Sequence, residues 1–190
     1  MIFLTVGTQL PFDRLVRGMD DWAAAHPDTE VFGQIGPASY RPRHFNHAEF
    51  LPPDEIDEHF RRAQVIVAHA GVGSIVSSLT LRKPIIVMPR RQALGEHRSD
   101  HQVATARWLE EELRLNIALD VPSLLAMLEQ RELLQPGLEI GERAQPALID
   151  ALQLFVGRQR RPSTLRGFAN WIGTLPRFMR ETAETRRARS

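Results

Sequence analysis

The sequence predicts an α/β fold built on a doubly wound parallel sheet. Segments with strand character alternate with segments of helical periodicity along the chain. The predicted strands are apolar throughout, which is typical of strands that helices cover on both faces. Glycine-bearing or polar turns follow several of these strands. A sheet of this kind binds its ligand beyond the carboxyl ends of the strands, so those turns are the candidates for a site.

In the first third of the chain, a short β-branched strand stops at Gly7 and leads into a helix with one apolar face. Pro52 and Pro53 then separate a weak strand from a second helix. In chain order we expect a strand over residues 2–6, a helix over 12–23 and a strand over 29–32. A loop over 34–47, a weak strand over 48–51 and a helix over 54–63 follow.

The clearest unit follows, with an apolar strand, a glycine-bearing turn and a helix over residues 65–68, 69–74 and 75–81. Two more strands are predicted over residues 84–88 and 116–119. The helices predicted for the remainder span residues 98–113, 121–132 and, from about residue 136 or 138, up to residue 156.

The formal net charge of +1 hides two unlike parts. Residues 1–157 carry 15 Arg and Lys against 21 Asp and Glu, a balance of −6. Residues 158–190 carry nine Arg against two Glu, a balance of +7. We therefore expect a globular domain over residues 1–157 and a basic tail over residues 158–190.

Composition excludes several classes of site. The absence of cysteine excludes disulfides, thiolate nucleophiles and cysteine-ligated zinc. Lys83 is the only lysine and no Gly-Lys-Ser/Thr occurs, which excludes a P-loop. Neither predicted glycine turn carries the three-glycine fingerprint of dinucleotide-binding proteins, which argues against a dinucleotide-dependent dehydrogenase. No apolar run approaches the ~20 residues of a membrane span, so we expect a cytoplasmic protein.

The turn His69-Ala70-Gly71-Val72-Gly73-Ser74 is the sharpest local feature. Its glycines permit close backbone approach, and a helix start offers free N–H groups to an anion such as a diphosphate. A plain strand-to-helix turn capped by Ser74 explains the same pattern equally well. His69 is the one histidine expected at a strand's carboxyl end, whereas His26, His44, His47 and His59 are expected at the surface.

A second polar segment, residues 89–102, follows the strand predicted over residues 84–88. Its Glu96, Asp100 and Gln102 could bind sugar hydroxyls, or the segment could be an ordinary solvated surface with a helix cap. No His-Glu-x-x-His pattern occurs, and we expect no metal and no cofactor.

The basic tail shows an amphipathic pattern, with arginines opposite Trp171, Phe168 and Leu175. Three interpretations remain open: docking on an anionic membrane surface, docking on a partner subunit, and packing back on the globular domain. Nucleic acid is not expected as a partner, since the globular part is acidic.

Four ordered segments resemble a known family: residues 3–16 around Gly7-Thr8-Gln9, the turn 69–74, the segment 83–90, and Gly95-Glu96-His97 with Asp100-His101-Gln102. Residues 1–120 are similar to the small catalytic subunits of split family 28 glycosyltransferases. The PssE-type exopolysaccharide subunits fit best; the dolichol-linked N-acetylglucosamine transferase subunit and the carboxyl-terminal half of MurG are further relatives.

The resemblance implies a Rossmann-like domain that is one half of a GT-B enzyme and binds a UDP-sugar. By position, Gly7, Thr8 and Gln9 would border the cleft and help to hold phosphate. His69 would be catalytic and, with Gly71, Gly73 and Ser74, would cradle the diphosphate. The backbone near Phe50 and Leu51 would meet uracil. Glu96, Asp100 and Gln102 would lie by the ribose or donor sugar.

The resemblance also implies metal-independent, inverting transfer to a polyprenyl-diphosphate-linked saccharide. The acceptor half would be a membrane-anchored, PssD-like partner, which places the complex at the cytoplasmic face of the inner membrane. Many relatives carry Glu where this chain has Ser77, so ribose anchoring would differ here. The alternatives are a non-catalytic scaffold of the same fold and another GT-B chemistry such as epimerisation.

Overall fold

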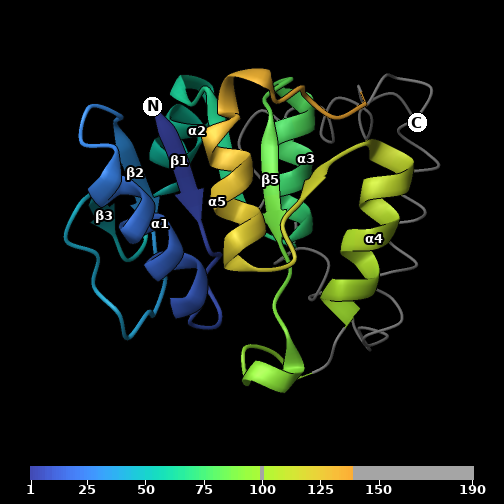
Figure 1. Cartoon of the computed structure of the whole chain (residues 1–190), viewed down its shortest axis with the longest axis horizontal. Coiled ribbons are helices and arrows are strands. Elements are labelled where there is room, and N and C mark those ends of the chain that lie inside the picture. Colours follow the sequence, from blue (N-terminus) through green and yellow to red (C-terminus); the bar gives the residue numbers. More distant parts are fainter. Residues whose placement is uncertain (99–100, 139–190) are drawn as a thin grey trace, which may run out of the picture. The chain divides into compact units, whose positions relative to one another are not determined.

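A computed structural model describes residues 1–98 and 101–138 (Figure 1). Its centre is one sheet of six parallel strands in the order β3-β2-β1-β4-β5-β6. The strands are β1 (Ile2–Thr5), β2 (Val31–Gln34), β3 (Asn46–Ala48), β4 (Val65–His69), β5 (Ile85–Met88) and β6 (Asn116–Ile117). The chain runs outward from β1 to β3 and then restarts beside β1 with β4. This order confirms the predicted doubly wound sheet and places its switch point between β1 and β4.

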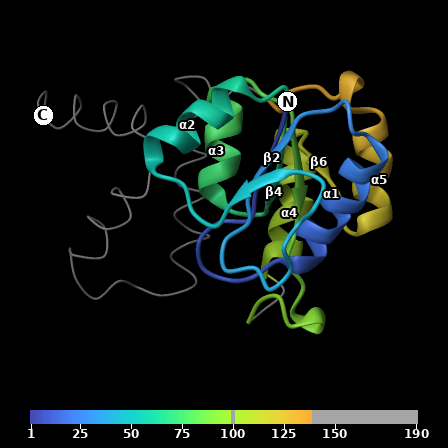
Figure 2. The same cartoon turned by 90° about the vertical axis from the view of Figure 1, so that its left-hand side faces the viewer.

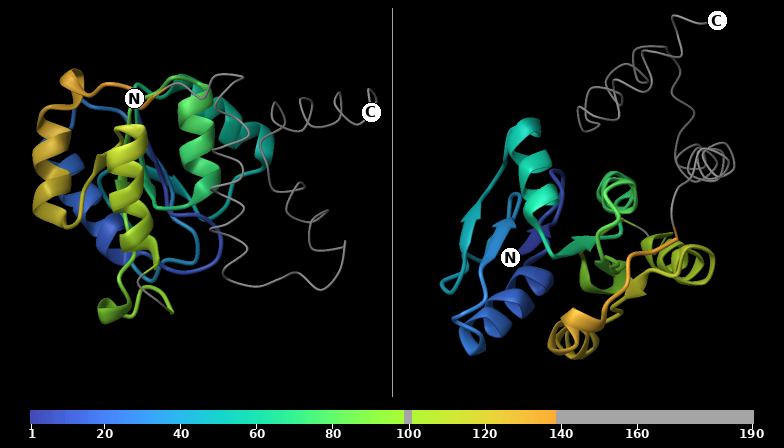
Figure 3. Two further views of the ribbon diagram at one scale, coloured as in Figure 1. Left: turned by 90° about the vertical axis from the view of Figure 1, so that its right-hand side faces the viewer. Right: turned by 90° about the horizontal axis from the view of Figure 1, so that it is seen from above.

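The helices are α1 (Asp13–Ala25), α2 (Pro53–Arg62), α3 (Val72–Thr80), α4 (His101–Leu113) and α5 (Val121–Glu129). Two short 3-10 turns, η1 (Gln92–Leu94) and η2 (Arg131–Leu133), follow β5 and α5. Figures 2 and 3 show α1 and α5 on one face of the sheet and α3 on the opposite face. Pro52–Glu58, which include the first turns of α2, belong to a separate compact unit.

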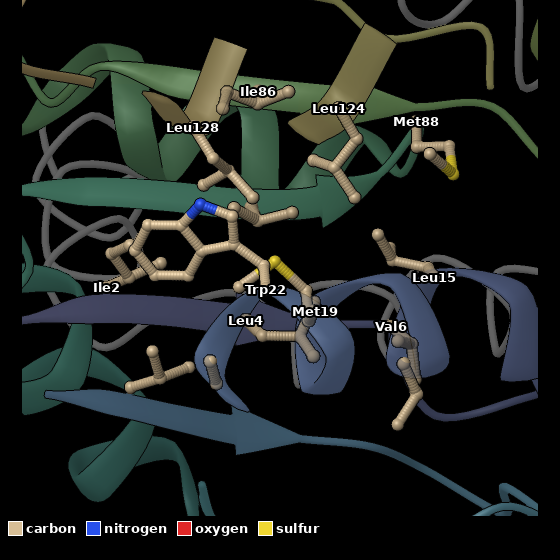
Figure 4. Packing of buried hydrophobic residues seen from close by; sticks show 14 of the residues in the cluster. Ile2, Leu4, Val6, Leu15, Met19, Trp22, Ile86, Met88, Leu124 and Leu128 are labelled. Carbon is tan, nitrogen blue, oxygen red and sulfur yellow. The ribbon is translucent and has the colours of Figure 1, made fainter. Parts of the chain in front are cut away.

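The main core lies between the sheet and the helices α1 and α5 (Figure 4). The apolar positions of α1 recur every three or four residues, so one face of the helix enters this core. The core side chains include Ile2, Leu4, Val6, Leu15, Met19, Trp22, Ile86, Met88, Leu124 and Leu128. At the end of α1, the indole Nε1 of Trp22 donates to Glu129 Oε1 at 2.8 Å, which joins α1 to the end of α5.

The opposite face is closed in part by aromatic stacking. The ring of His59 stacks on Phe3 and Phe32, with centroid distances of 5.2 and 4.1 Å. Phe60 meets Phe3 edge-on at 5.3 Å. The prediction that His59 is a surface residue is therefore wrong, because its ring packs against two phenylalanines of the sheet.

The loop between β2 and β3 is held to α1 by a buried carboxylate. Asp20 accepts hydrogen bonds from the Tyr40 hydroxyl at 2.6 Å and from the backbone N–H groups of Arg43 and His44 at 2.9 and 2.8 Å. Burial opposes the ionisation of Asp20, but these bonds outweigh it and hold the pKa of the carboxyl below its usual value.

Several predicted boundaries move. The weak strand predicted over residues 48–51 is β3 at Asn46–Ala48, and α3 begins at Val72, three residues earlier than expected. The helix predicted over residues 121–132 ends at Glu129, where η2 follows. Residues 136–138 are not helical, and the rest of the last predicted helix, the domain boundary at 157 and the basic tail lie outside the described residues.

None of the helices described within residues 1–98 and 101–138 has the length and apolar character of a membrane-spanning helix.

Candidate functional site

The predicted turns meet at the switch point of the sheet. Thr5 of β1 pairs with Ala68 of β4, so the residues that follow them emerge side by side at the carboxyl edge. A Cβ atom on Gly7 would lie 2.7 Å from Cε1 of His69, and one on Gly71 would lie 2.3 Å from Nε2. Real Cβ atoms do not approach so closely, so both positions must be glycine while His69 keeps this place.

His69 is held as a neutral imidazole. Burial and, to a lesser degree, the positive charge of Arg90 lower its pKa to about 4, against a weaker opposing interaction with the backbone of Thr5. Its Nδ1 atom is buried and has no hydrogen-bond partner in the described part of the chain. At neutral pH the ring therefore carries one N–H donor and one acceptor nitrogen.

The first turn of α3 supplies further donors. Gly71 is the N-cap residue, and no side chain caps this helix end. The backbone N–H groups of Val72, Gly73 and Ser74 donate to no other described residue. Ser74 is the third residue of the helix, so the interpretation of Ser74 as the cap is wrong. A Cβ atom on Gly73 would meet nothing within 4 Å, so the space beside this turn is open.

The loop after β1 forms the other side of the site. Thr8 and Gln9 are exposed, and Gly7 adopts a positive φ of +78°. Gly36, after β2, also has a positive φ, and a Cβ atom there would lie 2.8 Å from the Gly7 carbonyl oxygen. Backbone therefore packs on backbone here, which a larger residue at position 36 would prevent.

Phe50 and Leu51 follow β3 at the same edge of the sheet. The Phe50 side chain is 49% exposed, and the carbonyl of the preceding Glu49 accepts the Gly36 N–H at 2.9 Å. The structure therefore places this segment beside the loop of Gly36, which follows β2, and two strands away from the loop of Gly7, which follows β1.

Two predicted sugar-binding residues are engaged in protein contacts. The Glu96 carboxylate binds Arg14 through two hydrogen bonds, 2.7 Å from Nε to Oε1 and 2.9 Å from Nη2 to Oε2. Oε2 also accepts the backbone N–H of Arg91 at 2.9 Å. Gln102 is buried, and its Oε1 accepts the backbone N–H of Arg90 at 3.0 Å. Asp100 lies outside the described residues.

Arg90 was not singled out by the sequence patterns. It lies two residues after the end of β5 and is only 3% exposed. A charged residue at the carboxyl end of an apolar strand is the signal that could have found it.

The open region at this edge is distinct from a groove of about 550 Å³ near the start of β6. That groove is lined by residues such as Arg114, Asn116 and Met127, and by none of the predicted site residues. The described residues contain no cluster of three or more His, Asp or Glu side chains able to hold a metal ion.

Comparisons with known proteins identify a family for this chain. Residues 1–144 match the protein family described as "Glycosyltransferase family 28 C-terminal domain". The mouse UDP-N-acetylglucosamine transferase subunit ALG13 is 28% identical over 120 residues, which cover 58% of this chain and 10% of that protein. The chain therefore spans about a tenth of the length of this curated relative.

The fold of one solved structure is similar to that of this chain. The glycotransferase of kitacinnamycin aligns with a TM-score of 0.52 at 20% identity, over 68% of this chain and 34% of that one. MurG of Acinetobacter baumannii aligns with a TM-score of 0.47 at 20% identity, over 70% of this chain and 42% of that one.

Proposed function

The chain belongs to the glycosyltransferase family 28 C-terminal domain family, and from this premise we propose that it is the donor-binding catalytic subunit of a two-subunit, inverting glycosyltransferase. Its donor would be a UDP-sugar. Its acceptor would be a polyprenyl-diphosphate-linked saccharide in the biosynthesis of an exopolysaccharide or a related glycan.

The observation that carries the proposal is the arrangement of Gly7, His69 and Gly71 at the switch point, beside the uncapped start of α3. A diphosphate there would accept hydrogen bonds from the N–H groups of Gly73 and Ser74 and from the Ser74 hydroxyl. The positive end of the helix dipole favours an anion at the same place. Gly7, Thr8 and Gln9 would close the site from the β1 side.

In the transfer step, the acceptor hydroxyl oxygen would form a bond to the anomeric carbon. The bond from that carbon to the diphosphate oxygen would break, and its electron pair would leave with UDP. The proton of the hydroxyl would pass to a base on the partner subunit. His69 would donate from its ring to the departing diphosphate, together with the N–H groups of α3, and so supply the electrostatic stabilisation without a metal.

The rest of the donor would lie along the carboxyl edge. Uracil would meet the backbone at Phe50 and Leu51, while Glu96, Asp100 and Gln102 would approach the ribose or the donor sugar. Glu96 and Gln102 already have protein partners, so Glu96 would reach sugar hydroxyls through its remaining lone pairs and Gln102 through its Nε2 donors or the remaining lone pair of Oε1. Ser77 is buried, so a strong ribose contact from that position is not part of the proposal.

A partner subunit is part of the proposal because the mouse relative is described as a transferase subunit. GT-B transfer needs an acceptor-binding half, which the partner would supply. We propose a membrane-anchored, PssD-like partner at the cytoplasmic face of the inner membrane. The basic tail, with nine Arg against two Glu, would bind that partner or anionic lipid.

Thermal unfolding of the full chain with and without millimolar UDP tests donor binding. A ligand that binds the folded state raises the melting temperature, and we expect a clear rise with UDP and none with uridine. His69→Ala and Ser74→Ala should reduce the rise. His26→Ala and Ser39→Ala are matched controls away from the site and should keep it.

The absence of any shift with UDP in the wild-type chain would refute donor binding. The alternative, a scaffold that keeps the fold, is tested by assaying transfer with the co-expressed partner. A complex that neither binds UDP nor transfers sugar would support the scaffold.

A further inference from the structure

A single buried arginine holds the loop after β1 from both of its ends. The Arg90 Nη2 atom donates to the carbonyl oxygens of Val6 and Leu10, each at 2.8 Å. Its Nη1 atom donates to the carbonyl oxygen of Pro11. The guanidinium carbon also lies 4.5 Å from the centroid of the Phe12 ring.

These contacts flank the three residues Gly7, Thr8 and Gln9. Val6 precedes them, while Leu10 and Pro11 follow them, so one guanidinium closes the base of the loop. The described residues give the Thr8 and Gln9 side chains no hydrogen bond of their own. The carbonyls at its two ends therefore hold the loop, together with the packing of Gly36 on Gly7 and the contact of the Gly7 N–H with Thr5 Oγ1 at 3.5 Å.

The guanidinium is well suited to this task. It is planar, rigid and rich in donors, and it binds several carbonyl oxygens at once where an ammonium acts as a compact point charge. Burial lowers the pKa of Arg90 to about 10, against an opposing effect of the Glu96 charge. The group is therefore a cation at neutral pH, and its hydrogen bonds are charge-assisted.

The other end of Arg90 is held as well. Its backbone N–H donates to Gln102 Oε1, which ties the residue to α4. Next to it, the Arg14 Nη2 atom donates to the Pro89 carbonyl at 3.1 Å while Arg14 also binds Glu96. The loop after β1 and the segment after β5 are thus joined at the switch point.

We propose that Arg90 is a positioning residue of the donor site. Its hydrogen bonds hold the loop Gly7–Gln9 in the conformation that binds the diphosphate. The proposal rests on the proposed donor binding at this edge of the sheet. Arg90 does not touch the ligand; it acts through the loop and through its buried positive charge, which is felt at His69.

The test compares Arg90→Lys and Arg90→Gln in the full chain by calorimetric titration with UDP, at a temperature where each variant is folded. Arg90→Lys keeps the charge but loses the planar fork, and we expect the Kd for UDP to rise roughly 10-fold to 100-fold, as misplaced binding groups commonly produce. Arg90→Gln should weaken binding at least as much.

Arg91→Gln is the matched control. The Arg91 side chain also donates to a backbone carbonyl, but to that of Leu119 after β6, at 2.7 Å, and to none in the loop after β1. We expect the Arg91→Gln variant to be less stable than wild type, but to bind UDP with a Kd within about twofold of the wild-type value. Arg90 variants that bind UDP as tightly as Arg91→Gln would overturn the proposal, while a wild-type chain that fails to bind UDP would instead refute the proposed function.

A second readout separates positioning from simple loss of stability. The charges that act on His69 are those of Arg90 and, more weakly, His97. An NMR titration of the His69 ring should show a raised pKa in Arg90→Gln and a pKa near the wild-type value in Arg90→Lys. Equal His69 pKa values in all three proteins would show that the charge of Arg90 does not reach the site and would contradict the proposal.

Discussion

The ring of His69 occupies the space that a side chain on Gly71 would need, with Nε2 only 2.3 Å from the position of a Cβ atom. The backbone of Gly71 is extended, with φ of −97° and ψ of 131°, and any residue can adopt it. Glycine is therefore required at position 71 by the histidine two residues before it and not by its own backbone.

Gly71→Ala should lower the free energy of unfolding by about 1–3 kcal/mol, because the added methyl group overlaps the imidazole. Chemical denaturation measures the change. In a His69→Ala background the same substitution should cost much less, since the overlapping ring is gone. An equal cost in both backgrounds would show that the contact with His69 is not the cause.

Gly73→Ala should separate stability from binding. A Cβ atom there meets nothing within 4 Å, and alanine favours a helix over glycine, so the free energy of unfolding should stay unchanged or rise by up to about 1 kcal/mol. UDP binding should nevertheless weaken by roughly tenfold or more, because the methyl group fills space that the diphosphate would use. A Gly73→Ala chain with unchanged UDP affinity would place the diphosphate elsewhere.

The lowered pKa of His69 predicts a loss of stability in acid. The folded-state pKa of about 4 lies below the usual value of 6.5, so the unfolded chain binds the proton more readily. The stability contributed by the neutral ring is complete above pH 6.5 and falls as the pH drops toward 4, by up to about 3 kcal/mol. Urea denaturation of wild type and His69→Gln across this range isolates the effect, and parallel pH profiles would contradict it.

The ion pair of Arg14 and Glu96 should be energetically coupled. Its side chains are 19% and 10% exposed, and the contact is bidentate, so a double-mutant cycle with alanine should give about 1–3 kcal/mol. The pair of Arg41 and Glu49 is a natural control, at 3.5 Å with side chains 55% and 46% exposed. Its coupling should stay below about 0.5 kcal/mol, and similar values for both pairs would argue against a role for burial.

Tyr40→Phe should weaken the hold of Asp20 on the loop between β2 and β3. The substitution removes a 2.6 Å hydrogen bond to a buried carboxylate and should cost about 1–2 kcal/mol at pH 7. It should also raise the pKa of Asp20 in the folded state. The ionised Asp20 stabilises the fold above its unfolded-state pKa of 3.8, and this stabilisation is lost as the pH falls through the folded-state pKa. The variant should therefore unfold at a higher pH in an acid titration; an unchanged midpoint would contradict this.

The sequence predicted the parallel sheet well because strands buried on both faces leave uninterrupted apolar runs, as in Ile85–Met88. It was less accurate where short-range signals compete. The pattern at residues 69–74 was compatible with a capped turn, yet the helix begins at Val72 without a side-chain cap. The aromatic stacking of His59 on Phe3 and Phe32 left no local signal, since it depends on how distant segments pack.

By itself, the sequence determined the alternation of strands and helices, the glycine turn after Val65–His69 and the family to which the chain belongs. Only the tertiary structure decided which polar groups are free. Glu96 pairs with Arg14 across 82 positions of sequence, and Arg90 binds carbonyls about 80 residues earlier, because the strand order places β5 near β1. Such partners are chosen by three-dimensional proximity, and residue type or local periodicity carries no record of them.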